Sequence, residues 1–159
     1  MGLAIATVQK FLFGPDKPGN LINTMSFGAY NKPFESQGQK FAWLSRDVEE
    51  VDKYEKDPYC GYVMSIGFYH SFFKGIMSMY GKDALNINKK LPIKIAVGSM
   101  DPVSNQSALA EKLYKFYLDL GLTNVTYKVY KDARHEILNE TNREEVQADM
   151  IKFIEGVFN

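Results

Sequence analysis

The chain has 159 residues, of which 45% are hydrophobic, and its 19 acidic residues balance its 19 basic ones. A chain of this length can bury one core, and its balanced charge predicts neither a nucleic-acid partner nor binding to a charged membrane surface. Its two histidines and single cysteine, Cys60, lie far apart in the sequence, so we expect no intrachain disulfide, no metal cluster and no cofactor.

The first 40 residues predict short helices joined by turns. Residues 3–13 have helical apolar spacing and end at Gly14-Pro15, but they are too few to span a bilayer. They also lack the basic start and the cleavage site of a signal peptide. We therefore expect a cytoplasmic protein without a transmembrane segment. Residues 16–33 are rich in turn formers and predict a helical hairpin, and residues 34–40 predict a polar loop.

Two more helices are predicted before residue 85. Ser45 is the expected N-cap of an acidic helix over residues 48–54, which Asp57-Pro58 ends. Residues 62–80 then form a long segment, rich in Phe, Tyr and Met, that is apolar on nearly every helical face. Such a helix is either buried or faces an apolar cleft.

The next stretch predicts a strand over residues 93–97, a helix over 104–120 and a second strand over 125–130. A crossover of this kind makes the two strands parallel. Asp101 follows the first strand and His135 the second, so both should lie at the carboxyl ends of the strands, where open α/β sheets place their chemistry. A carboxylate that binds an imidazole supports proton transfer. The alternative from spacing alone is an Asp-Pro turn and a structural histidine.

The end of the chain predicts one more amphipathic helix. Thr141 and Glu144 form a capping-box pattern, and apolar residues then recur at helical spacing up to Val157. The sequence therefore divides into a helical, aromatic first half, residues 1–85, and an α/β second half, residues 86–159.

Several motifs resemble one family. Residues 91–103, which contain Gly98-Ser99-Met100-Asp101-Pro102, resemble the acid-bearing strand and turn of the α/β-hydrolase superfamily. Residues 128–140, which contain Ala133-Arg134-His135-Glu136, resemble the histidine loop of its monoglyceride-lipase and lysophospholipase-like members. Residues 31–34 and 43–61 resemble the cap of bacterial members. The resemblance covers nearly the whole chain, with its motifs in matching order.

This resemblance implies the C-terminal part of an α/β-hydrolase fold, with a helical cap over residues 1–85 and a parallel β-α-β-α unit over residues 86–159. The sheet would be incomplete in this chain. Asp101 would be the acid and His135 the general base of a catalytic triad. The implied substrate is a small lipid-like ester, such as a monoacylglycerol or a lysophospholipid. Phe68, Phe72 and Met64 would line the acyl entrance in the cap, although such side chains at helical spacing also suit a plain core.

The nucleophile of that family is absent from the sequence. The family carries its serine in a Gly-x-Ser-x-Gly elbow upstream of the cap, and no such pentapeptide occurs here. The nearest match centres on Ser65, but Val63 occupies the first glycine position and Ser65 follows the cap motifs. Ser99, Ser104 and Cys60 are no better placed. We therefore expect little or no activity from this chain alone.

Two parallel strands are not a normal stable core, because parallel sheets are normally buried on both faces. The strand over residues 93–97 would leave an apolar edge without a partner. We expect this edge to be covered by a missing N-terminal half of the fold or by self-association. The alternative function is a non-catalytic binding or self-assembling module derived from the hydrolase fold.

Overall fold

The structure, a computed structural model, describes residues 2–158 and contains two compact units. The first comprises the described residues up to Ala29 together with Pro58–Ile87. The second comprises Tyr30–Asp57 together with the described residues from Asn88 onward. The sequence-based division into a cap, residues 1–85, and a hydrolase core, residues 86–159, assigns functional roles to these parts of the chain. It stays a prediction.

The first unit is helical. Helix α1 (Gly2–Phe13) packs against α4 (Ile66–Met79), and α2 (Asn20–Phe27) completes a core of Ala6, Ile22 and Tyr69. The predicted helix over residues 3–13 is thus confirmed, and it ends where Gly14 adopts a φ of +87°. The predicted segment over residues 62–80 is helical only from Ile66, because the side chain of Ser65 caps the helix by accepting a hydrogen bond from the Phe68 N–H at 3.2 Å.

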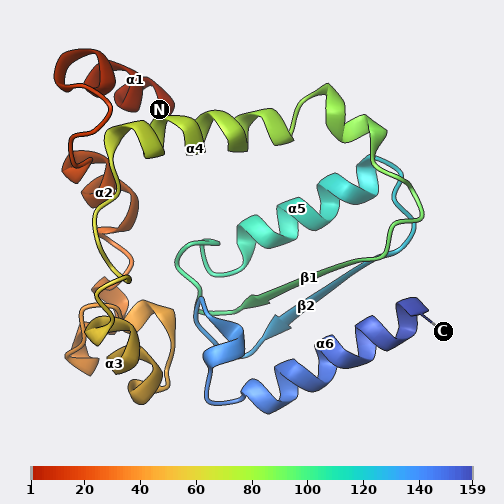
Figure 1. The fold of residues 1–159 in the computed structure, drawn as a ribbon. Coiled ribbons are helices and arrows are strands. Elements are labelled where there is room, and N and C mark those ends of the chain that lie inside the picture. Colours follow the sequence, from red (N-terminus) through yellow and green to blue (C-terminus); the bar gives the residue numbers. More distant parts are fainter. Residues whose placement is uncertain (1, 159) are drawn as a thin grey trace. The chain divides into compact units, whose positions relative to one another are not determined.

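The second unit is built around two parallel strands, β1 (Ile93–Gly98) and β2 (Val125–Tyr130). Their register pairs Ile93 with Val125 and Gly98 with Tyr130, which confirms the predicted parallel pair. Helices α5 (Ala108–Asp119) and α6 (Arg143–Phe158) lie on opposite faces of this sheet (Figure 1). The fold is therefore a partial α/β sheet covered on both faces.

Successive side chains of β2 point to opposite faces of the sheet and contact different helices. Tyr127 of β2 stacks on Tyr114 of α5, with the ring centroids 5.5 Å apart. Its neighbours Lys128 and Tyr130 point the other way, and both bind Asp149 of α6. Because successive strand residues face opposite sides, a shift of one residue would exchange these two sets of contacts.

Three sequence predictions about local structure in this unit are wrong. Helix α5 begins at Ala108 rather than at residue 104, because Asn105, Gln106 and Ser107 all have positive φ and cannot belong to a right-handed helix. The predicted polar loop over residues 34–40 contains the 3₁₀ helix η1 (Lys32–Gln37), which buries Phe34. Asp47, not Ser45, caps α3 (Val48–Lys56), since its carboxylate accepts the N–H groups of Glu49 and Glu50.

Gly98 lets the end of β1 approach the chain after β2. A Cβ at this position would lie 2.2 Å from the carbonyl oxygens of both Ala133 and Arg134. These are backbone atoms in a segment that also accepts the Met100 N–H at Ala133 O, 2.9 Å away. The residue at 98 therefore sets the distance between the two loops that follow the strands.

Gly98→Ala is expected to lower the free energy of unfolding by about 1–3 kcal/mol, because the added methyl group overlaps backbone that cannot rotate away. Gly156→Ala is the matched control, since a Cβ at this position in α6 meets no atom within 4 Å. It should leave stability unchanged or raise it by about 0.5–1 kcal/mol. Urea unfolding of the two variants checks this, and equal effects would contradict the assigned role of Gly98.

Candidate active site

Asp101 is held at the carboxyl end of β1 by its own turn. Its side chain accepts the Val103 N–H at 3.0 Å, and its carbonyl oxygen accepts the Ser104 hydroxyl at 3.2 Å and the Gln106 N–H at 2.9 Å. The residue is only 4% exposed. A carboxylate fixed in this way loses little further conformational entropy when it binds another group.

His135 lies in the loop after β2, and its Nδ1 is 3.0 Å from Oδ1 of Asp101. The side chain of His135 is 38% exposed, against 6% for Asp101, so the imidazole stands between a buried acid and solvent. Its backbone N–H donates to the Trp43 carbonyl at 3.4 Å, and the next N–H, of Glu136, donates to Leu44 O at 2.8 Å. The structure thus brings together the two residues that the sequence placed at one end of the sheet.

The electrostatics of this pair favour an ionised acid. Burial acts to raise the pKa of Asp101, but hydrogen bonds from His135, Ser104 and the Val103 N–H outweigh it, and the pKa lies below its ordinary value. An ionised Asp101 is only an acceptor, so Nδ1 of His135 must be the donor. Nε2 of the neutral ring is then an acceptor that can take a proton from a substrate or a nucleophile.

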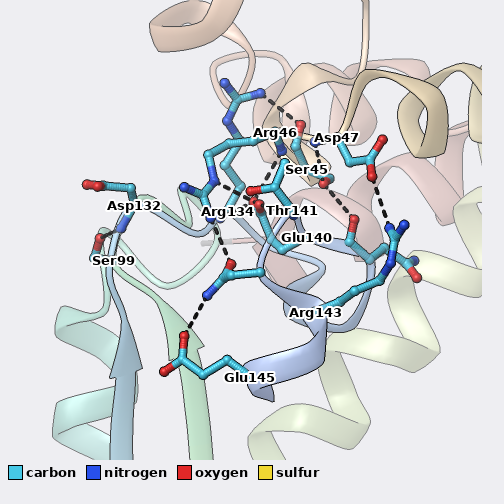
Figure 2. Close-up of polar contacts among 12 residues, drawn as sticks. Ser45, Arg46, Asp47, Ser99, Asp132, Arg134, Glu140, Thr141, Arg143 and Glu145 are labelled. Atoms are coloured by element: carbon cyan, nitrogen blue, oxygen red, sulfur yellow. Dashed lines mark hydrogen bonds and ion pairs between the residues drawn. The ribbon is translucent and has the colours of Figure 1, made fainter. Parts of the chain in front are cut away.

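A second polar cluster supports the histidine loop, and sequence reasoning missed it. Glu140 is fully buried, with 0% of its surface exposed. Its carboxylate accepts the N–H groups of Arg134 at 2.7 Å, Thr141 at 3.1 Å and Arg46 at 3.2 Å, as well as Nε of Arg46 at 2.8 Å (Figure 2). Nothing in the sequence distinguishes this glutamate from the chain's exposed acids.

The side chain of Arg134 joins the same two segments. Its Nη1 donates to Ser45 O at 2.9 Å, to Gln37 Oε1 at 2.7 Å and to Ala42 O, and its guanidinium lies 4.2 Å from the ring centre of Phe34. Burial lowers the pKa of Arg134, although Glu140 opposes this effect. The loop that carries His135 is therefore fastened to residues 37–46 through the residue directly before it.

Ser99 and Ser104, the candidate nucleophiles in the same unit as Asp101 and His135, are both engaged in turns. Ser65 lies in the helical unit as the cap of α4. Ser99 accepts the Asp132 N–H at 2.8 Å (Figure 2), and the Ser104 hydroxyl is bound to the Asp101 carbonyl and accepts the Ser107 N–H at 3.0 Å. Each of the two serines near Asp101 thus supports a turn. Cys60 lies in the helical unit, like Ser65.

The three predicted substrate-binding residues all belong to the helical unit. Phe68 and Phe72 stack on each other on α4, with centroids 5.7 Å apart, and are 43% and 49% exposed. Met64 instead packs against the core of Ala6, Ile22 and Tyr69. The two phenylalanines thus offer an accessible aromatic surface, whereas Met64 contributes to packing.

None of the helices formed by residues 2–158 has the length and apolar character that a membrane span requires. Within the same range, no three or more His, Cys, Asp and Glu side chains are grouped so that they could hold a metal ion.

Comparison with known proteins identifies the fold. The family model described as "Serine aminopeptidase, S33" matches residues 10–142. A carboxyl esterase from Bacillus coagulans superposes with a TM-score of 0.87 at 22% identity, over 99% of this chain and 52% of its own. A lipase in an open form gives 0.80 at 23%, over 99% and 50%. A monoacylglycerol lipase from Paleococcus ferrophilus gives 0.66 at 23%, over 95% and 50%.

The chain therefore spans about half the length of these three solved structures, and it shares with them part of the α/β-hydrolase fold. The comparison with curated protein sequences gave no match. The predicted fold class, an α/β-hydrolase fold with an incomplete sheet, is confirmed by the partial coverage and by the two-stranded sheet.

Glu140→Ala should lower the free energy of unfolding by about 3–5 kcal/mol, because it leaves the partly exposed guanidinium of Arg46 and three backbone N–H groups without their acceptor. Glu140→Gln keeps the shape and should cost less. Glu144→Ala, at an exposed position in the first turn of α6, is the control and should change stability by no more than about 0.5 kcal/mol. Urea unfolding measures all three, and a tolerated Glu140→Ala would contradict this role.

The lowered pKa of Asp101 predicts how acid affects stability. Because the folded-state pKa lies below the ordinary value of 3.8, the carboxylate adds stability that is fully present above that pH and is lost as the pH falls through the folded pKa. Asp101→Asn keeps the size of the side chain and removes the charge. The stability difference between the two proteins should therefore narrow only below about pH 4. Urea unfolding at a series of pH values tests this, and a constant difference down to the acid limit would disprove it.

Proposed function

Because the chain belongs to the serine aminopeptidase S33 family, we propose that it supplies the acid and the base of the catalytic triad of an esterase- or lipase-type serine hydrolase. Asp101 orients His135, and His135 is the general base. One observation carries this proposal: Nδ1 of His135 lies 3.0 Å from Oδ1 of Asp101, after the carboxyl ends of two neighbouring parallel strands. This is where open α/β sheets place their chemistry.

The proposed steps follow from the geometry of this pair. Nε2 of His135 takes the proton of a serine hydroxyl as the oxygen attacks the ester carbonyl, and Asp101 stabilises the imidazolium that forms. The imidazolium then protonates the leaving alcohol. In the second half of the reaction His135 takes a proton from water as the water oxygen attacks the acyl-serine carbonyl, and the imidazolium then returns this proton to the serine oxygen as the acyl–serine bond breaks and the carboxylic acid leaves. The serine and the oxyanion N–H donors come from a segment outside these 159 residues, since no Gly-x-Ser-x-Gly sequence occurs here.

The proposed substrate is a small lipid-like ester, such as a monoacylglycerol or a lysophospholipid. Two of the similar structures are described as a carboxyl esterase and a monoacylglycerol lipase, which supports this class. Residues 1–85 would be the cap that admits the acyl chain, with the exposed aromatic surface of Phe68 and Phe72 along its path. Residues 86–159 would be the catalytic part. We place the enzyme in the cytoplasm, as a single cysteine suits a reducing compartment.

The proposed partner is the remainder of the same fold. The sheet within the described residues has only two strands, and β1 pairs with β2 along one edge. Ile95 and Val97 make β1 an apolar strand, and an apolar edge favours pairing with another strand. An N-terminal half of the hydrolase fold would supply that strand, and a second copy of this chain is the alternative.

The activity test compares the purified chain with the chain co-expressed with an α/β-hydrolase N-terminal half that carries Gly-x-Ser-x-Gly. We expect no turnover of p-nitrophenyl acyl esters by the chain alone and clear turnover by the pair. In the active pair, His135→Ala and Asp101→Asn should each lower kcat on the order of 10⁴-fold. His70→Ala, which removes the other histidine, should leave kcat unchanged.

Two other outcomes of the activity test would contradict the proposed function. Turnover by the chain alone that His135→Ala abolishes would show that the nucleophile lies within these residues. An inactive pair whose C-terminal chain instead associates tightly with itself, measured by analytical ultracentrifugation, would favour a non-catalytic self-assembling module over the enzyme.

A further inference from the structure

The imidazole of His135 contacts a second group besides Asp101. Its ring centroid lies 5.3 Å from that of the Trp43 indole, with the two planes tilted by 41°. The hydrogen bond to Asp101 fixes one ring nitrogen, but a single bond leaves the ring free to swing about it. A rigid neighbour against the ring removes this freedom.

Trp43 is such a rigid neighbour. It is 8% exposed and belongs to the short 3₁₀ helix η2 (Ala42–Leu44). The ring of Tyr30 meets it edge-on, with centroids 5.3 Å apart and planes at 61°. The backbone N–H of Trp43 donates to Oδ1 of Asn31 at 3.1 Å, and the Trp43 carbonyl accepts the backbone N–H of His135 at 3.4 Å. Backbone and side chain of Trp43 thus both contact His135.

We propose that Trp43 is a positioning residue for His135, and that its indole holds the imidazole in the orientation that Asp101 fixes. This inference rests on the proposed role of His135 as the general base. The face of an indole attracts a cation, so the contact also favours the imidazolium that forms when His135 takes a proton. Trp43 and Asp101 therefore both favour the imidazolium form of His135. Trp43 contacts the ring face, and Asp101 binds Nδ1.

Fluorescence tests the contact directly, because Trp43 is the only tryptophan in the chain. A protonated imidazole that touches an indole quenches its emission. We expect the emission of the purified chain to fall when acidification protonates the imidazole, His135→Gln to remove this transition, and His70→Gln to keep it. The pKa of Asp101 lies below 3.8 and that of Tyr30 above 10.0, so neither group changes its charge between these two pH values.

The absence of this transition in the unmodified chain, or its survival in His135→Gln, would overturn the proposal. Neither measurement needs a substrate or a second chain. A failure of the esterase experiment and a failure of this one are therefore separate results.

NMR tests the positioning role. The Nδ1 proton of His135, bound to Asp101, should give a downfield resonance protected from exchange with water. Trp43→Leu removes the ring face and should broaden or abolish this resonance, whereas Trp43→Phe keeps an aromatic face and should retain it. Far-UV circular dichroism confirms that each variant is folded. An unchanged resonance in Trp43→Leu would overturn the proposal, and if that variant does not fold, the fluorescence titration of the unmodified chain decides.

Discussion

The buried carboxylate of Glu140 is the interaction on which the geometry of the candidate site depends. It lies five residues after His135, and it accepts hydrogen bonds from Arg46 and from the backbone of Arg134. A charge with no exposed surface is tolerated only when its oxygens are satisfied, and here four donors satisfy them. An arrangement with fewer donors would be much less stable, so Glu140 selects one position for the histidine loop relative to residues 42–46.

The two parallel strands also determine the geometry of the site. Because both strands run the same way, Asp101 and His135 follow them at the same end of the sheet, and Gly98 lets the two following loops approach within van der Waals contact. The helices on the two faces fix the register of the strands. The distance between Asp101 and His135 is therefore set by backbone geometry, and their side chains need only complete a hydrogen bond.

The sequence predicted those parts of the site that depend on order along the chain. Asp101 and His135 were found because a residue just after a strand has a known place in a parallel sheet. Glu140 and Trp43 were not assigned to the site, because their importance comes from partners about 90 residues away, which spacing cannot show. The sequence pattern pointed to Ser45 instead of Asp47 as the cap of α3 for the same reason. The Ser45 hydroxyl donates to Asn139 O at 2.8 Å, and this partner is also distant in the sequence.

Those distant partners also bear on the order of folding. Helices such as α5 form from neighbours in sequence, but the contacts between Arg46 and Glu140 close a loop of 94 residues. Closing a loop of this length costs entropy before any contact repays it. We expect the strand–helix–strand unit to form first and the segment around Trp43 to dock onto it afterwards. The acid end of the candidate site would then exist before the histidine acquires its final position, so a folding intermediate would present Asp101 already fixed and His135 still mobile.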